Sequence, residues 1–330
     1  CGKSGRKYGM NRKKSYDGYI LQIHRLPGRT RSDSKPAEAV LIMHGLISSS
    51  ADFIVTGPKR SLAYILHDEG YDVWLGNSRG NTFSRNHTTL VPSWHEIGLN
   101  DAAATIDYVR NFTSQEKIFY IGYSQGTTQF WVLTSMKPEY NDRIKLMLAL
   151  APAAYLGHVR GLAKILSPAI LNVKVSSTKF IRLALYFCSA SCRCSVICMY
   201  MLHMYVCTYL IHTGCSCKQV IHYAQQVEGP GKLLKNVLYN SPVPPEYPVH
   251  KITVPVVLYN SGDDWLATPE DVELLKKKLP NVVEKYTLKS KRINHLDFIF
   301  GNTIPLLLYD RLLQRMREFS DPLRHLHMNI

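Results

Sequence analysis

Residues 117–126 read KIFYIGYSQG, a short apolar run that leads into Gly122-Tyr123-Ser124-Gln125-Gly126. An apolar run closed by glycine is typical of a buried parallel strand, and residues 124–136 have a helical pattern. The G-x-S-x-G order between a strand and a helix indicates a nucleophile elbow, a turn so tight that only very small side chains fit beside the serine. We therefore interpret Ser124 as a nucleophile that stands above a sheet, at the positive end of a helix.

Similar apolar runs recur on both sides of this segment, with helical patterns between them. We predict strands at residues 39–43, 71–76, 117–122, 146–152, 254–259 and 283–288. Helices are predicted at residues 94–112, 124–136, 269–279 and 305–319. Strands that alternate with helices form a mostly parallel sheet that is covered on both faces. Together with the elbow, this alternation predicts an α/β protein with the α/β-hydrolase fold.

The alternation stops between residues 152 and 251, where the chain is rich in Cys, Met and Tyr. This stretch interrupts the sheet between the fourth and fifth predicted strands, so we interpret it as an inserted, largely helical cap. The predicted division is residues 1–152 for the first part of the core, 153–250 for the cap and 251–330 for the second part of the core. The apolar run from Val196 to Ile211 is shorter than the roughly 18 residues of a membrane span. We expect it to cover a lipid pocket and expect no transmembrane anchor.

A serine hydroxyl needs a base that takes its proton, and that base is normally a histidine held by a carboxylate. In this fold the acid and then the histidine follow the serine along the chain. His295 comes directly after the last predicted strand, whereas His250 precedes a strand, on the opposite side of the sheet. His325 and His327 lie in the C-terminal tail. The placement therefore predicts His295 as the base.

The acid and the oxyanion hole are predicted from the loops after other strands. Asp263 and Asp264 both follow the fifth predicted strand, and their chemistry alone leaves the choice between them open. An oxyanion hole needs two backbone N–H groups, one from the residue after the nucleophile and one from the loop after an early strand. We expect these donors to be Gln125 and Leu46. His44, in the same early loop, is expected to shape the loop rather than to transfer a proton.

The charge and the cysteines of the chain limit the kinds of partner and metal site that we expect. The formal net charge is +15, and the basic residues gather near the start of the chain, a pattern that suits anionic lipid surfaces or nucleic acid. Because no zinc-finger spacing, RNA-binding aromatic motif or helix-turn-helix signal accompanies the charge, we expect no nucleic-acid partner. Seven of the eight cysteines fall between residues 188 and 217, without the usual C-x₂-C spacing of a zinc site. We expect one disulfide, further free thiols and no metal.

Two sequons, at Asn86 and Asn111, indicate N-glycosylation and the secretory route.

The motifs around these residues give the chain a family likeness. The segments that carry it are Asp17–Leu21, His44–Leu46, Asp72–Asn81, Trp94–Gly98, Gly122–Thr127, Asp264–Ala267 and Asn294–Phe298. In these segments the chain resembles the acid lipases, the family of the gastric and lysosomal lipases and of many insect lipases. The resemblance implies Asp264 as the acid, and it supports Ser124, His295, Leu46 and Gln125 in the roles given above.

The resemblance also implies an activity and a setting. It implies hydrolysis of lipid carboxylic esters, triacylglycerols or sterol esters, through an acyl-enzyme and without a cofactor. The setting implied is secreted or lysosomal, with a cap that meets the lipid interface and carries a disulfide matching Cys188 with Cys198. Tyr123 stands where the family usually has His, and we expect it to face the core with little effect on the chemistry. The chain also lacks a stretch of the family's cap between Cys207 and His212.

Two alternatives remain beside the lipid esterase. One is a short-chain carboxylesterase, and the other is a catalytically impaired lipid-binding relative with an altered cap. The second need not keep a Ser, an Asp and a His together, whereas this chain has all three in order. Epoxide hydrolases and dehalogenases share the fold but need Asp at the elbow, where this chain has Ser124.

Overall fold

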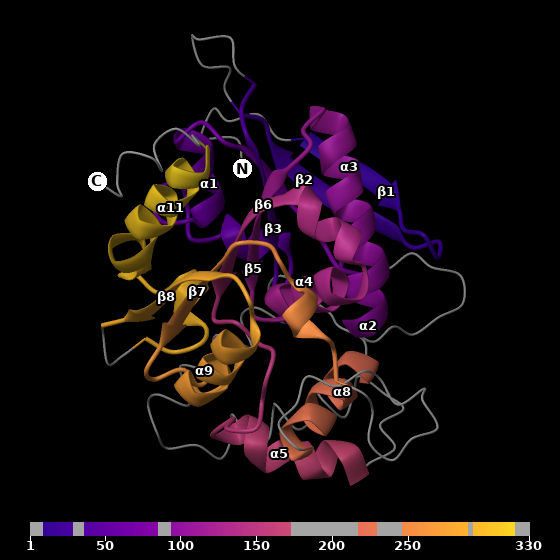
Figure 1. Cartoon of the computed structure of the whole chain (residues 1–330), viewed down its shortest axis with the longest axis vertical. Coiled ribbons are helices and arrows are strands. Elements are labelled where there is room, and N and C mark those ends of the chain that lie inside the picture. The colour runs from indigo at the N-terminus through magenta and orange to yellow at the C-terminus, as the bar shows by residue number, and fades with distance from the viewer. Residues whose placement is uncertain are drawn as a thin grey trace.

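The computed structural model describes residues 9–28, 36–84, 94–172, 217–229, 246–289 and 293–320. A central sheet lies between layers of helices, and two further helices stand below one end of the sheet (Figure 1). The strands are β1 (Gly9–Lys14), β2 (Ile20–Leu26), β3 (Ala39–Met43), β4 (Asp72–Leu75), β5 (Ile118–Tyr123), β6 (Ile144–Leu150), β7 (Val256–Ser261) and β8 (Val282–Leu288). The α-helices are α1 (Leu62–Asp68), α2 (Trp94–Glu96), α3 (Ala103–Thr113), α4 (Gln125–Met136), α5 (Leu162–Asn172), α8 (Cys217–Glu228), α9 (Pro269–Lys278), α10 (Asp297–Phe300) and α11 (Asp310–Ser320).

The eight strands form one sheet in the order β1-β2-β4-β3-β5-β6-β7-β8. The pairs from β4 through β3 to β8 are parallel, whereas β1 with β2 and β2 with β4 are antiparallel. The parallel part contains the six predicted strands, each within about two residues of its predicted ends. The mostly parallel sheet and the helices on its faces confirm the predicted α/β class.

The two antiparallel strands were not predicted. β1 carries Arg12, Lys13 and Lys14 and alternates between exposed and half-buried residues, as suits a strand at the edge of a sheet. β2 buries Leu21 and Ile23 fully, but polar residues separate them. Neither strand is a continuous apolar run, because neither is covered on both faces.

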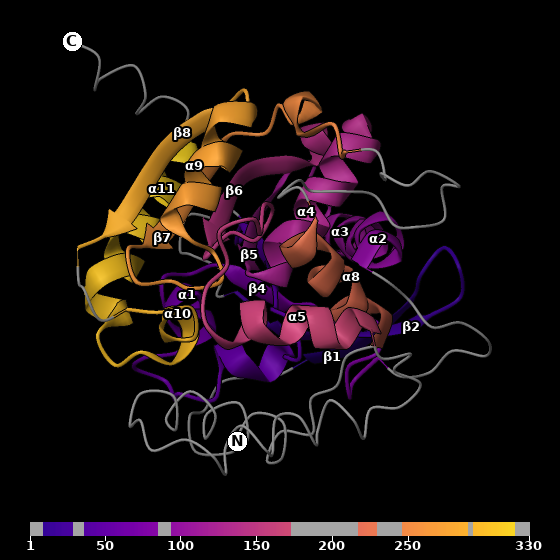
Figure 2. The same cartoon turned by 90° about the horizontal axis from the view of Figure 1, so that it is seen from below.

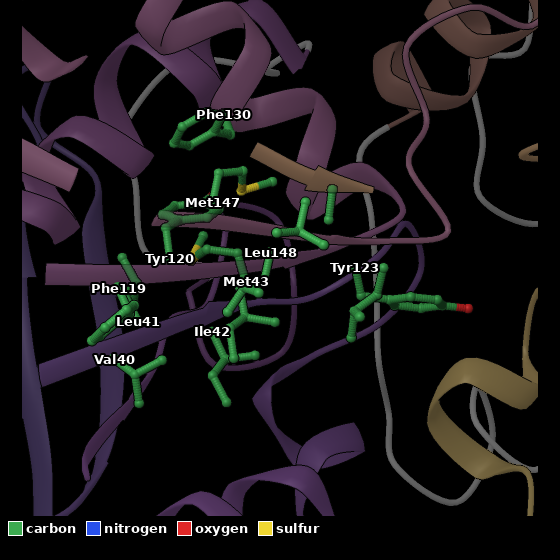
Figure 3. Packing of buried hydrophobic residues seen from close by; sticks show 14 of the residues in the cluster. Val40, Leu41, Ile42, Met43, Phe119, Tyr120, Tyr123, Phe130, Met147 and Leu148 are labelled. Carbon is green, nitrogen blue, oxygen red and sulfur yellow. The ribbon is translucent and has the colours of Figure 1, made fainter. Parts of the chain in front are cut away.

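The core lies on both sides of the parallel strands. Every residue of β3, β4 and β5 is buried, which explains why these strands appear as unbroken apolar runs in the sequence. Figure 3 shows side chains of β3, β5 and β6 gathered in this core, with Phe130 of α4 beside them. Each fully buried aliphatic side chain contributes about 1.5–3 kcal/mol of hydrophobic stabilisation. The loops at the strand ends therefore extend from a closely packed, rigid core.

The helix predicted at residues 94–112 contains a wider turn. Between α2 and α3 the chain forms a π-helical segment, η2 (Ile97–Ala102). This segment packs Gly98 against α4 so closely that a Cβ on Gly98 would lie 2.7 Å from Cβ of Val132. It also places the buried Asp101 against Arg79, whose guanidinium reaches Asp17 at 2.6 Å as well. One buried arginine in the loop after β4 thus connects the turn between β1 and β2 to this helix.

The other predicted helices have the expected ends. α9 begins at Pro269 after Thr268, whose side chain accepts the N–H of Asp271, and it ends in three lysines. The C-terminal helix consists of a second π-helical segment, η5 (Pro305–Tyr309), followed by α11. Short 3₁₀ turns occur at Ser50–Phe53 (η1), Pro138–Arg143 (η3) and Val249–Lys251 (η4).

The described part of the predicted cap is helical. α5 and α8 pack against each other, and α8 lies next to the start of α4 in both views (Figures 1 and 2). The predicted disulfide Cys188–Cys198, the sequon at Asn86 and the apolar run from Val196 to Ile211 lie outside the described residues. Within the described ranges, no helix combines the length and the apolar character needed to cross a membrane.

Candidate active site

The elbow joins β5 to α4 at Ser124, which has φ of 50° and ψ of −114°. A positive φ is strained for a residue with a Cβ, and such strain is found mainly at functional sites. The two flanking glycines allow the turn to close. A Cβ on Gly122 would lie 2.8 Å from the carbonyl carbon of Gly126, and a Cβ on Gly126 would lie 2.2 Å from the carbonyl oxygen of Met43. The elbow thus touches β3, and neither glycine position has room for a Cβ.

Three predicted residues form one hydrogen-bonded chain at this elbow. Nε2 of His295 lies 2.8 Å from Oγ of Ser124. On the other side of the ring, Nδ1 of His295 lies 2.8 Å from Oδ2 and 3.1 Å from Oδ1 of Asp264. His295 and Asp264 are both buried. The structure therefore brings together the three residues, from the loops after β5, β8 and β7, that were predicted as nucleophile, base and acid.

The carboxylate of Asp264 is held by its own loop. Its Oδ1 accepts the backbone N–H groups of Leu266 and Ala267 at 2.8 and 2.9 Å. Asp263 is half-buried, and its backbone N–H bonds to Oγ of Ser261. In the described part of the chain, the carboxylate hydrogen-bonded to His295 is that of Asp264. The geometry therefore favours Asp264 in the choice that the two side chains left open.

The loop expected to carry the oxyanion hole passes directly beside the nucleophile. A Cβ on Gly45 would lie 3.4 Å from Cβ of Ser124 and 2.9 Å from the ring of Tyr123, so this position has no room for a larger residue. Leu46 follows Gly45 in this loop, and Gln125 is the first residue of α4. The first N–H groups of a helix have no partner within the helix. Of the two predicted donors, Gln125 thus follows Ser124 directly at the start of α4, and Leu46 follows the glycine that contacts Ser124.

His44 holds this early loop in shape. Its Nδ1 donates to the carbonyl of Gly45 at 2.8 Å, and its Nε2 accepts the N–H of Ser78 at 3.1 Å. Burial lowers the pKa of His44 to about 4, partly opposed by the bond to Gly45. A neutral ring that uses one nitrogen as donor and the other as acceptor matches this arrangement. The geometry supports the structural role that we expected for His44.

Tyr123 has a role that the sequence did not reveal. It is buried, as expected, but its hydroxyl donates to the backbone carbonyl of His295 at 3.0 Å. Its ring centre lies 5.4 Å from that of the His295 imidazole. In Figure 3 Tyr123 lies apart from the other labelled core side chains, with its hydroxyl pointing away from them. No local pattern predicts this contact, because 172 residues separate the partners.

Gln219 of α8 is a second neighbour of the site that sequence reasoning missed. Its Oε1 accepts from Nε2 of Gln125 at 3.1 Å, and both side chains are buried.

The predicted sequon residue Asn111 lies on α3 and is exposed.

Comparison with known proteins assigns the chain to a family. A model described as the alpha/beta hydrolase fold matches residues 38–187, and one described as a partial alpha/beta-hydrolase lipase region matches residues 13–57. Lipase 1 of Drosophila melanogaster is 39% identical, over 90% of this chain and 74% of its own length. Gastric triacylglycerol lipase of Mus musculus is 36% identical over 92% of this chain and 86% of its own. The chain belongs to the acid lipase family.

Other relatives of this acid lipase agree. Human lysosomal acid lipase/cholesteryl ester hydrolase is 33% identical over 92% of this chain and 86% of its own. A solved esterase of Thermogutta terrifontis has a TM-score of 0.58 at 16% identity, over 97% of this chain and 99% of its own, and it shows the fold alone. The predicted family, the α/β-hydrolase fold and the class of carboxylic ester hydrolase are thereby confirmed.

Proposed function

We propose that this acid lipase hydrolyses triacylglycerols or sterol esters with Ser124 as nucleophile, His295 as general base and Asp264 as the acid that orients the base. The observation that carries the proposal is the continuous hydrogen-bonded chain from Oγ of Ser124 through the imidazole to the buried carboxylate. The relatives named as a triacylglycerol lipase and a cholesteryl ester hydrolase support the two ester classes.

The proposed reaction has two halves. In the first, Oγ of Ser124 attacks the ester carbonyl while Nε2 of His295 takes its proton. The tetrahedral intermediate then expels the alcohol, which leaves with that proton, and an acyl-serine remains. In the second half, His295 takes a proton from water, and the resulting hydroxide attacks the acyl-serine. The carboxylic acid product is then released as Ser124 regains a proton from His295. Asp264 stabilises the imidazolium that forms in each half.

Negative charge develops on the carbonyl oxygen in both halves, and we infer that the backbone N–H groups of Gln125 and Leu46 receive it. The position of Gln125 at the start of α4 supports this, because the positive end of the helix dipole lies there. The contact of Gly45 with the elbow supports Leu46, since it keeps the next residue beside Ser124.

We further infer that residues 153–250 form the cap and that this cap meets the lipid interface. Leu156, Val159 and Val227 form a small apolar cluster separate from the main core, as an inserted unit would. On α5, Ile165 is 72% exposed, a large apolar side chain placed for contact with lipid. The gastric and lysosomal relatives and the exposed sequon at Asn111 support a secreted or lysosomal setting.

Turnover of matched esters tests the substrate class. Wild type and Ser124→Ala would be assayed with p-nitrophenyl butyrate, emulsified trioleoylglycerol and cholesteryl oleate. We expect wild type to hydrolyse a long-chain ester and Ser124→Ala to lose activity by about 10⁴- to 10⁶-fold. Turnover of the butyrate alone would make the protein a short-chain esterase. Absence of turnover on all three, with lipid still bound, would make it a lipid-binding relative.

A further inference from the structure

The helix α8 contacts the start of α4 through two polar bonds. Gln219 accepts from Nε2 of Gln125 at 3.1 Å, and the hydroxyl of Tyr223 lies 3.1 Å from Oγ1 of Thr128. Gln219 and Tyr223 are four residues apart, so both project from the same face of α8. Gln125 and Thr128 are three residues apart on the first turn of α4, where their side chains are also neighbours. The second helix of the described cap region is thus fixed to the turn that follows the nucleophile (Figure 2).

We propose that Gln219 is a positioning residue that holds Gln125, and with it the backbone N–H at the start of α4, in the geometry that binds the oxyanion. The proposal rests on the proposed function, in which that N–H is an oxyanion donor. Gln219 itself does not touch the reacting atoms. It acts through the amide of Gln125, which links the packing of the cap to the stabilisation of the transition state.

The two side-chain amides that form the bond between Gln219 and Gln125 are both buried. Gln125 is 1% and Gln219 is 2% exposed, so water does not readily replace either partner. A buried amide left without its partner costs roughly 1–3 kcal/mol, which disfavours any arrangement in which the two side chains part. Retaining the bond restricts the rotamer of Gln125 at the place where the chain leaves the strained turn of Ser124.

The neighbouring bond anchors a different part of α4. Oγ1 of Thr128 also donates to the carbonyl of Ala153 at 2.7 Å, three residues after the end of β6. Tyr223 therefore contacts a threonine that already has a second hydrogen-bond partner. Within the described ranges, the side chain of Gln125 is held by its bond to Gln219, so Gln219 is the contact whose loss should reach the oxyanion donor.

Variants of α8 separate positioning from folding. Gln219→Met keeps the length of the side chain and removes its amide, Gln219→Glu keeps an acceptor oxygen, and Gln225→Met makes the same change at a half-buried position of the same helix. The readouts are kcat and KM on p-nitrophenyl butyrate and the inhibition constant of an aliphatic trifluoromethyl ketone. Such a ketone forms a tetrahedral adduct with the serine and places an oxyanion in the hole.

Removing an oxyanion-hole donor outright costs about 10²–10³ in kcat, so loosening one should cost about 10-fold. We expect Gln219→Met to lower kcat about 10-fold with KM within twofold, and to weaken the ketone by a similar factor. Gln219→Glu should recover most of kcat, and Gln225→Met should match wild type. In a Gln125→Met background, Gln219→Met should cause no further loss of kcat, because the bond is already absent.

Three outcomes would overturn the proposal while wild type remains active. The first is an unchanged kcat and ketone affinity in Gln219→Met. The second is an equal loss in Gln225→Met, which would indicate a general effect on the helix. The third is a full additional loss in the Gln125→Met background. If wild type neither turns over the ester nor binds the ketone, the proposed function itself fails, which is a distinct result.

Discussion

Tyr123 shows how one residue contacts two parts of the site. Its ring lies beside Gly45, next to the proposed oxyanion donor Leu46, and its hydroxyl donates to the carbonyl of His295, the proposed base. The expectation that it faces the core with little effect on the chemistry did not include these contacts. The identity of the side chain was visible in the sequence, but its partners were not, because they come from distant loops.

Replacing Tyr123 by Phe tests the contact with the base. The ring stays and the hydroxyl is lost, so the loop that carries His295 should lose one anchor worth about 1 kcal/mol. We expect kcat on p-nitrophenyl butyrate to fall about 3- to 10-fold with KM little changed. Tyr259→Phe is the matched control, because the buried hydroxyl of Tyr259 has no hydrogen-bond partner among the described residues. Equal effects of the two variants would contradict a positioning role for Tyr123.

At the scale of elements, the strands and helices of the core were predictable because each carries its own local pattern. β3, β4 and β5 are buried on both faces and appear as apolar runs, and α9 has a capping threonine and a first-turn proline. The π-helical turn η2 was not predictable, since it depends on a tertiary contact between Gly98 and α4. The proximity of Ser124, Asp264 and His295 was predictable because the fold determines which strand ends lie close together.

The close approach of the elbow to β3 gives a prediction at this scale. Gly126→Ala would place a Cβ 2.2 Å from the carbonyl oxygen of Met43, so β3 and α4 have to separate. We expect a loss of unfolding free energy of about 2 kcal/mol or more and a loss of most activity, measured by denaturant melts and ester turnover. Gly262→Ala is the control, because a Cβ there meets nothing within 4 Å. A Gly126→Ala protein as stable and active as Gly262→Ala would show that the elbow is not packed as described.

For the whole molecule, the sequence predicted the sheet and its covering helices in outline, and it marked residues 153–250 only as an interruption of the pattern. β1 and β2 were missed because they lie toward the edge of the sheet and lack continuous apolar runs. The contacts of α8 with α4 join residues about 95 positions apart in the sequence, and no local periodicity predicts such contacts.

The buried carboxyl of Asp52 gives the stability of the molecule a pH dependence. Burial raises the pKa of Asp52 to about 7, partly offset by a hydrogen bond from Ser48. The unfolded chain has an ordinary pKa near 4, so between about pH 4 and pH 7 the folded state holds a proton that the unfolded state has released. This contribution to stability is therefore fully present below about pH 4, falls progressively as the pH rises, and is lost above about pH 7.

Asp52→Asn should remove that contribution, because the amide stays neutral at every pH. We expect the variant to match wild type near pH 4 and to be more stable by roughly 2–4 kcal/mol at pH 8, in urea melts at pH values from 4 to 8. Asp142→Asn, at an exposed position, should leave the pH dependence unchanged. A wild-type protein that loses no stability relative to Asp52→Asn between pH 5 and pH 8 would contradict this account.

The rate of labelling by a fluorophosphonate tests the central claim most directly. The reagent reacts with an activated serine, and mass spectrometry of the digested protein locates the adduct. We predict a single adduct on Ser124, absent in Ser124→Ala, with labelling slowed by about 10³- to 10⁴-fold in His295→Ala and Asp264→Asn and little changed in Asp263→Asn. An adduct on another residue, or equal labelling rates in wild type and Asp264→Asn, would contradict the account of Ser124 as a nucleophile activated by His295 and Asp264.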